Sequence, residues 1–207
     1  MMISHTVEPH TVGVDEVGRG PLAGPVVACA CHLPIGLNAS WVNDLADSKK
    51  LSANARERLA AILRENVPYA LGEASVAEID TLNILQASLL AMRRAVEALQ
   101  LKLGHDITLI VDGNQRIPNL TLPQKTLVQA DATVPCVSAA SILAKVHRDA
   151  CMAALAQTYP HYGWASNAGY GSAHHMAALQ EFGATPHHRS SFAPVRAVLE
   201  MEKRDAA

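Results

Sequence analysis

Residues 11–33 read Thr-Val-Gly-Val-Asp-Glu-Val-Gly-Arg-Gly-Pro-Leu-Ala-Gly-Pro-Val-Val-Ala-Cys-Ala-Cys-His-Leu. The segment Thr11–Val14 is short, apolar and rich in β-branched residues, which favours a strand ending at the acidic pair Asp15-Glu16. The apolar run 25–33 predicts a second strand. Between them, residues 18–24 hold three glycines and a proline, which is typical of a loop of defined shape. This part of the chain therefore predicts strand, shaped loop and strand.

Strands and helices alternate through the rest of the sequence. Six apolar residues of 85–103 recur at steps of four and three, the spacing of one helix face, and Gly104 closes this helix. A long helix between two strands predicts a crossover and a parallel pairing. The other expected strands are 69–76, interrupted at Gly72, 107–111 and 125–129; the other expected helices are one from Ser52, its cap, to about Glu65, then 138–156, 173–182 and 195–203.

This alternation predicts an α/β fold, with residues 1–160 as the core and 161–207 as a helical region packed on it within one structural domain. The chain has 207 residues, of which 49% are hydrophobic and 17% charged, a balance that excludes a disordered chain and a coiled coil. The sequence lacks an apolar run of 18 residues and a secretory signal, so we expect a cytoplasmic protein without a membrane span. The formal net charge of −2 argues against a non-specific nucleic-acid coat but leaves a local basic groove open.

Carboxylates follow the predicted strands. Asp15 and Glu16 end the first strand, Asp112 ends the strand 107–111, and Asp131 follows the strand 125–129. Such positions converge at one edge of an α/β sheet, where the acids would repel one another unless cations lie between them. Hard oxygen ligands suit Mg²⁺ or Mn²⁺. The alternative is that each acid only begins a turn, where Asp is common.

Cysteine and histidine show no metal-binding spacing. The four cysteines, at 29, 31, 136 and 151, lack a Cys-x-x-Cys pair, so we expect buried, reduced thiols. We expect the ten histidines, including the pairs His174-His175 and His187-His188, to be surface or loop residues.

The segment Gly13-Val-Asp-Glu-Val-Gly-Arg-Gly-Pro-Leu-Ala-Gly-Pro-Val-Val27 resembles the opening signature of the type 2 ribonucleases H, the bacterial ribonuclease HII family. Further motifs of this family follow in order over about residues 12–195: Asp47-Ser-Lys-Lys-Leu-Ser52, Val111-Asp-Gly-Asn114, Ser138-Ala-Ala-Ser-Ile-Leu-Ala-Lys145, Arg148-Asp149, Gly169-Tyr170 and His188-Arg-Ser-Ser-Phe192. The resemblance implies a ribonuclease H-like mixed sheet flanked by helices, with a C-terminal helical region. It also implies cleavage of the RNA strand of RNA–DNA hybrids and incision 5′ to single ribonucleotides embedded in duplex DNA.

By position, the resemblance assigns the metal ligands and catalytic acids to Asp15, Glu16, Asp112 and Asp131. Two divalent ions about 3.5–4 Å apart, Mn²⁺ or Mg²⁺, can activate water, neutralise charge on the phosphate and stabilise the leaving oxygen. Asp15 is the candidate bridging ligand, and the products would carry a 3′-hydroxyl and a 5′-phosphate.

Substrate recognition requires reading one 2′-hydroxyl. The resemblance assigns this task to Gly18-Arg19-Gly20, and packing against the neighbouring deoxyribose to Tyr170. It also suggests phosphate contacts for Lys49 and Lys50, and phosphate contact or support of the acids for Ser141 and Lys145. The sequence departs from the family pattern at Ala168, Ser190 and His147, and losing the cations usual at the first two would weaken DNA contact or sharpen its salt dependence.

Two other functions fit parts of this pattern. Sugar kinases and actin-like phosphotransferases share such a core, but they need adenosine-binding glycine loops and usually two duplicated domains. A non-catalytic module that binds ribonucleotide-containing duplexes would be expected to lack an acidic ligand, and here all four candidates are present. We expect a monomer whose partners are RNA–DNA hybrids and ribonucleotide-containing DNA, with no membrane and no obligate protein partner.

Overall fold

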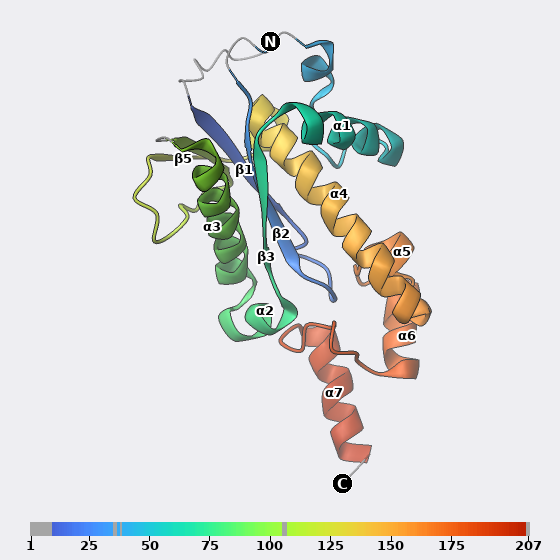
Figure 1. Ribbon diagram of the computed structural model, residues 1–207. Helices are drawn as coiled ribbons and strands as arrows, with labels where there is room; N and C mark the ends of the chain where they lie inside the picture. The colour runs from blue at the N-terminus through green and yellow to red at the C-terminus, as the bar shows by residue number, and fades with distance from the viewer. Residues whose placement is uncertain (1–9, 35–36, 38, 105–106, 206–207) are drawn as a thin grey trace. The chain divides into compact units, whose positions relative to one another are not determined.

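The computed structural model describes residues 10–34, 37, 39–104 and 107–205 of the chain (Figure 1). Residues 1–9, on which the expectation of no secretory signal rests, lie outside this range. Contacts group the chain into two units. The first contains 1–17, 27–73 and 88–146, and the second contains 18–26, 74–87 and 147–207. The predicted division after residue 160 stays a prediction.

A five-stranded mixed sheet lies at the centre of the first unit. Its strands are β1 (Thr11–Val17), β2 (Val26–His32), β3 (Tyr69–Ala74), β4 (Thr108–Asp112) and β5 (Gln124–Leu127), in the order β3-β2-β1-β4-β5. Strand β1 pairs antiparallel with β2 and parallel with β4, which in turn pairs parallel with β5. The predicted α/β fold, and the predicted parallel pairing after the long helix, are confirmed.

The strand that carries the acidic pair is longer than predicted. Asp15 and Glu16 lie inside β1 and not after it, because β1 stays paired with β2 as far as Val17↔Val27. The register with β4 extends to Val14↔Val111, so Asp15 and Asp112 are the next residues of two neighbouring parallel strands. Strand β3 also differs from the prediction, since it continues through Gly72 and ends at Ala74. A side chain at Gly72 would overlap the main chain of the helix that packs there, at Ala91.

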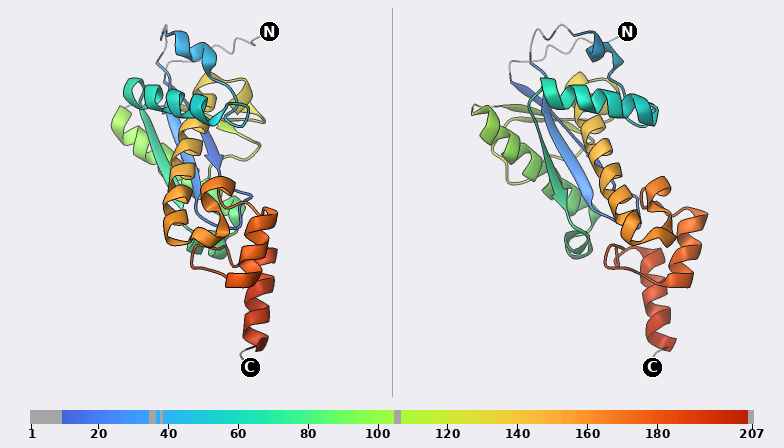
Figure 2. Two further views of the ribbon diagram at one scale, coloured as in Figure 1. Left: turned by 90° about the vertical axis from the view of Figure 1, so that its right-hand side faces the viewer. Right: turned by 45° about the vertical axis from the view of Figure 1, so that its right-hand side comes forward.

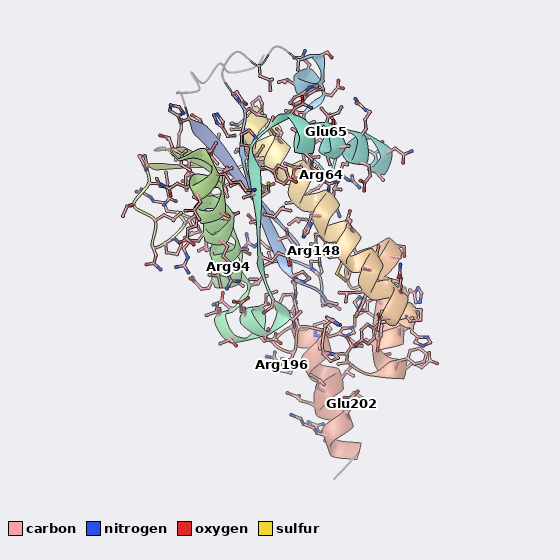
Figure 3. The ribbon with its side chains drawn as sticks, viewed as in Figure 1. Arg64, Glu65, Arg94, Arg148, Arg196 and Glu202 are labelled. Carbon is pink, nitrogen blue, oxygen red and sulfur yellow. The ribbon has the colours of Figure 1, made fainter. Side chains whose placement is uncertain are left out.

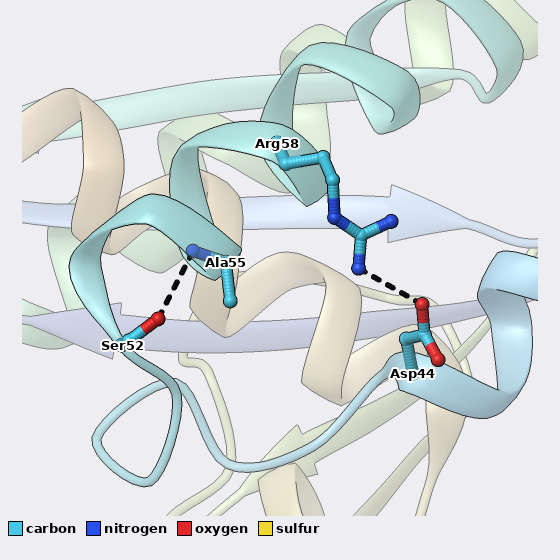
Figure 4. Close-up of polar contacts among 4 residues, drawn as sticks. All are labelled: Asp44, Ser52, Ala55 and Arg58. Atoms are coloured by element: carbon cyan, nitrogen blue, oxygen red, sulfur yellow. Dashed lines mark hydrogen bonds and ion pairs between the residues drawn. The ribbon is translucent and has the colours of Figure 1, made fainter.

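The helices of the described residues are α1 (Ala53–Asn66), α2 (Val76–Leu82), α3 (Ile84–Leu103), α4 (Pro135–Thr158), α5 (Trp164–Asn167), α6 (Ala173–Phe182) and α7 (Ala193–Asp205). Short 3₁₀ segments span Ser40–Asp44, Ala130–Ala132 and Pro160–Tyr162. Ser52 caps α1 as predicted, accepting a hydrogen bond from the Ala55 amide, and an exposed Arg58–Asp44 ion pair lies beside it (Figure 4). Helix α4 begins three residues earlier than predicted because Pro135 suits the first turn, where no amide donor is needed. Helix α2 was not predicted from the sequence.

Helices α1 and α4 cover one face of the sheet. Alternate residues of β2, among them Cys29 and Cys31, pack there against Leu59 and Leu63 of α1 and Ile142 of α4. Figures 1 and 2 show α1 lying across the first half of α4 in every view. Gly13 of β1 contacts the first turn of α4 so closely that any side chain would overlap its main chain. This close approach brings α4 to the acidic end of β1.

The cysteines are free thiols, and Cys29, Cys31 and Cys136 are buried as predicted, whereas Cys151 is half-buried. Burial raises the pKa of the Cys136 thiol to about 12. None of the helices in the described part of the chain is long and apolar enough to span a membrane.

An aromatic cluster forms a core in the second unit. The expectation of surface or loop histidines is wrong for His175, which lies in α6, whereas His188 lies in a loop but not at the surface. Both are buried, with Trp164 and Tyr162 around them. Trp164 Nε1 donates to His175 Nε2 at 3.1 Å, and the Nε2 atoms of His175 and His188 lie 3.0 Å apart. Each ring is buried because its nitrogens find hydrogen-bond partners inside the protein.

We predict that His188 makes stability depend on pH. Burial first, and then His175 and His187, lower the pKa of His188 from 6.5 to about 4. The unfolded chain therefore binds this proton more readily, so the stabilisation is complete above pH 6.5 and is lost as the pH falls toward 4. In urea unfolding, the free-energy difference between wild type and His188→Gln should shrink by about 2 kcal/mol between pH 7.5 and pH 4.5.

His161→Gln is the control, since His161 is exposed. If the difference between wild type and His188→Gln stays constant with pH, the assignment of a neutral, buried His188 is wrong.

Candidate metal and nucleic-acid site

Three of the four predicted acids lie close enough for their charges to interact, near the ends of β1 and β4. Asp15 is buried at 5% exposure, and Asp112 follows Val111, the last residue of β4 paired with β1. Asp131 lies in the short 3₁₀ segment Ala130–Ala132 before α4 and is buried at 6% exposure. Strand β1 and the β4–α4 connection thus bring together side chains that are far apart in the sequence.

Hydrogen bonds from the main chain fix this arrangement. The Ala130 amide donates to Asp112 Oδ1 at 2.7 Å, so Asp112 holds the turn that carries Asp131. Gln129 enables this turn by adopting the left-handed conformation, with φ at 58°. Ser138 of α4 donates its hydroxyl to the Asp131 carbonyl oxygen at 2.6 Å. The main chain of the β4–α4 connection therefore fixes the positions of Asp112 and Asp131.

Burial and mutual repulsion raise the pKa values of two of the acids. Burial, then the charges of Glu16 and Asp112, raise the pKa of Asp15 well above its ordinary value, although a hydrogen bond from Ser141 opposes this. Burial and Asp112 also raise the pKa of Asp131. A bound cation would relieve both effects, because it favours the ionised carboxylates. The donor set, all carboxylate oxygens, fits a hard divalent ion such as Mg²⁺ or Mn²⁺.

Glu16 lies differently from the other three acids. It stands opposite Ala28 in the β1–β2 register, whereas Asp15 stands opposite Cys29, so the strand's alternation directs the two side chains to opposite faces. Its charge still acts on Asp15. Among the described residues, no three of the four acids place oxygens within 4.8 Å of one another. The four carboxylates therefore do not form one tight cluster, as expected for like charges.

Lysine and serine side chains also interact with the acids of the first unit. Burial works to lower the pKa of Lys49, but the charges of Asp15, Asp131, Asp47 and Asp112 outweigh it and raise that pKa. Lys50 is exposed, and Lys145 is half-buried one turn after Ser141 on α4. The Ser141 hydroxyl lies 2.9 Å from that of Ser48, and both are buried, which fixes the group that contacts Asp15.

The loop 18–25 belongs to the second unit and is held by two arginines that the sequence analysis did not single out. Arg189 donates to the carbonyl oxygens of Gly18, Arg19, Gly24 and Pro25 at 2.6–3.2 Å. Arg148, labelled in Figure 3, donates to those of Ala23, Pro25 and Ala168 at 2.8–3.0 Å. Both arginines have 0% exposure.

The shape of this loop depends on glycine at position 18. Its φ of 95° is unfavourable for other residues, and a Cβ there would overlap the Arg148 side chain. The only signal that could have identified the two arginines from the sequence is their place in the motifs Arg148-Asp149 and His188-Arg-Ser-Ser-Phe192, which does not say that they are buried.

Tyr170 also belongs to the second unit, close to this loop. It is exposed at 46%, and a Cβ on Gly20 would lie 3.4 Å from its ring. Ala168 adopts a left-handed conformation in the turn before it. Ser190, a departure from the family pattern, donates its amide and hydroxyl to Asp80 of α2, so it has a structural partner.

Comparison with known proteins agrees with this fold. The sequence matches the ribonuclease HII family over residues 12–195. It is 57% identical to the ribonuclease HII of Rhodospirillum rubrum, over 90% of this chain and 85% of that protein. It is 56% identical to the ribonuclease HII of Sphingopyxis alaskensis, over 92% of each.

Solved structures share the fold. A ribonuclease H2 from Pyrococcus horikoshii is 26% identical, with a TM-score of 0.70, over 94% of this chain and 99% of that one. The Bst ribonuclease HIII in complex with Mn²⁺ is 20% identical, with a TM-score of 0.78, over 97% and 72%. Fold and acids define a metal-dependent nuclease with a ribonuclease H-like sheet. Within that class, the chain belongs to the ribonuclease HII family.

We predict that Asp15→Asn stabilises the metal-free protein. Burial and repulsion disfavour the ionised Asp15 carboxylate, so a neutral amide of the same shape should raise the free energy of unfolding at pH 7.5 by about 1 kcal/mol. Excess Mn²⁺ should reverse the order, because the ion stabilises the wild type more. Thermal unfolding with chelator and then with Mn²⁺ measures both effects. The exposed Glu57→Gln is the control, and a destabilised metal-free Asp15→Asn would contradict the proposed repulsion.

We predict that Arg189→Met costs about 3 kcal/mol or more, because several buried carbonyl oxygens lose a charged donor. Urea unfolding measures the loss, with the exposed Arg204→Met as the control. A change below about 1 kcal/mol would mean that water or another donor replaces the guanidinium.

Proposed function

We propose that this protein cleaves the RNA strand of RNA–DNA hybrids and incises 5′ to single ribonucleotides embedded in duplex DNA. The observation that carries the proposal is the mutually repelling pair of the buried Asp15 and the half-buried Asp112, which lie side by side near the ends of two neighbouring parallel strands. Membership of the ribonuclease HII family, with 57% identity to the relative from Rhodospirillum rubrum, supports the ribonuclease H activity.

Asp15, Glu16, Asp112 and Asp131 would hold two divalent ions. Bound there, the ions would supply a nucleophile from water and stabilise charge on the scissile phosphate and the leaving oxygen. Asp15 would suit the role of a ligand shared by the two ions, because the charges of both Glu16 and Asp112 act on its carboxylate. The Mn²⁺ in the ribonuclease HIII complex supports a divalent cofactor of this kind, either Mn²⁺ or Mg²⁺.

The chain's own residues would then orient the acids and the phosphate. Ser141, which is hydrogen-bonded to Ser48, donates a hydrogen bond to Asp15 and so orients the Asp15 carboxylate. Lys49 would balance the negative charge and contact the phosphate, with Lys50 and Lys145 as further cations for the backbone. Such contacts make binding weaken as salt rises.

Recognition of the ribonucleotide would fall to Gly18, Arg19 and Gly20. Arg189 binds the carbonyl oxygens of Gly18 and Arg19, which fixes the orientation of the peptide planes in this loop. Without side chains at Gly18 and Gly20, main-chain groups could approach a 2′-hydroxyl. The exposed Tyr170 ring beside Gly20 would pack against the sugar of the adjoining deoxyribonucleotide.

A labelled duplex with a single embedded ribonucleotide tests the proposed function. We expect a single cut 5′ to the ribonucleotide with Mn²⁺ or Mg²⁺, giving 3′-hydroxyl and 5′-phosphate ends, and none with chelator. Asp15→Asn and Asp112→Asn should each lower the rate at least about 100-fold while remaining folded by circular dichroism. Glu57→Gln should retain the wild-type rate.

Wild-type cleavage by either acid variant, or cutting in excess chelator, would overturn the assignment of the ligands. Binding of the duplex without a cut under all metal conditions would favour a non-catalytic module.

A further inference from the structure

We propose that the buried pair His175 and His188 positions Tyr170, so that two histidines act on the substrate through a tyrosine main-chain oxygen. This inference rests on the proposed role of Tyr170 at the sugar next to the ribonucleotide. All the residues involved belong to the second unit.

The first step concerns the main chain at Tyr170. His175 Nδ1 lies 2.9 Å from the Tyr170 carbonyl oxygen, which also accepts the Ser172 amide at 2.8 Å. Before it, the turn is tight: Ala168 and Gly169 both have positive φ, and Asn167 accepts the Gly169 amide. The Tyr170 side chain itself is exposed, so its direction is set through the backbone.

The second step is the proton arrangement of His175. Trp164 Nε1 has only a hydrogen to offer, and it lies 3.1 Å from His175 Nε2. That nitrogen must therefore accept, which places the ring hydrogen of neutral His175 on Nδ1. From there it donates to the Tyr170 oxygen.

His188 completes the arrangement. Its Nδ1 accepts the Thr185 amide at 3.0 Å and lies 2.9 Å from the Thr185 hydroxyl. Its hydrogen is therefore on Nε2, which donates to His175 Nε2 at 3.0 Å. This assignment places a hydrogen in every contact from Thr185 through His188 and His175 to Tyr170. The one lone pair of His175 Nε2 is then shared by the Trp164 and His188 donors, and that of His188 Nδ1 by the amide and the hydroxyl of Thr185.

The neutral state of both rings agrees with this arrangement. Burial lowers the pKa of both histidines, and the neighbouring His174 and His187 add to this effect. A second proton on either ring would set one N–H group against another. The pair therefore works as a rigid support with a fixed direction of hydrogen bonding.

Two substitutions at one position separate support of Tyr170 from support of the core. In His175→Asn the amide NH₂ can reach the place of Nδ1 and keep the bond to Tyr170. In His175→Gln the amide oxygen can reach the place of Nε2 and keep the acceptor for Trp164 and His188, but the bond to Tyr170 is lost. We expect His175→Gln to raise KM for a duplex with a single ribonucleotide about 10-fold with kcat within about 2-fold, and His175→Asn to restore most of the KM.

A double-mutant cycle with Tyr170→Ala completes the test. If His175 acts through Tyr170, then His175→Gln adds no further increase of KM to Tyr170→Ala. The exposed His174→Gln is the matched control and should leave KM unchanged. Equal losses in His175→Asn and His175→Gln, or additive losses in the double variant, would overturn the positioning role.

Histidine ¹⁵N NMR of the protein without substrate keeps this inference separate from the proposed function. We expect the Nδ1–H form for His175 and the Nε2–H form for His188 at pH 7.5. The opposite forms would overturn the positioning network whatever the enzyme cleaves. A Tyr170→Ala variant with wild-type KM would instead overturn the proposed role of Tyr170, even with the expected tautomers present.

Discussion

Mutual repulsion among buried and half-buried carboxylates near the end of β1 is the constraint on which the site depends. Parallel pairing of β1 with β4 places Asp15 beside Asp112, and the Asp112-capped turn adds Asp131. Burial strengthens every interaction between these charges, because the local dielectric constant is low. The metal-free protein therefore contains an unfavourable interaction that bound divalent cations would relieve, and the geometry persists because the sheet and α4 hold the acids from several sides.

Buried positive charges, in contrast, stabilise the loop 18–25. Arg148 and Arg189 are fully buried and direct their hydrogen bonds to main-chain carbonyl oxygens. A guanidinium offers five donors in a fixed plane, so each arginine can bind several peptide groups and hold them at set angles. A loop rich in glycine would otherwise sample many conformations. Two buried cations thus give a defined shape to a segment whose own sequence allows great freedom.

Much of this architecture follows from local patterns in the sequence. The apolar face of α3 and the Ser52 cap of α1 are signals that lie within the sequence of each helix. Both helices were therefore predicted almost to the residue. The acids could be grouped because strand ends meet at a sheet edge. The extension of β1 through Asp15 and Glu16 could not be predicted, because it depends on pairing with β2 across the loop.

The buried polar residues were harder still. His175 and His188 are polar by composition, and only the tertiary arrangement supplies Trp164, Thr185 and Tyr170 as their partners. The burial of Arg148 and Arg189 also lowers the number of cations that the surface of the protein offers to a ligand. These two cations cannot contact phosphates, so in the proposed function a duplex would be held by exposed groups such as Lys50 and by the proposed metal ions. The two proposed divalent ions would turn the formal net charge of −2 into +2. Attraction for nucleic acid would then depend on occupancy of the acidic site, which couples binding of the substrate to readiness for cleavage.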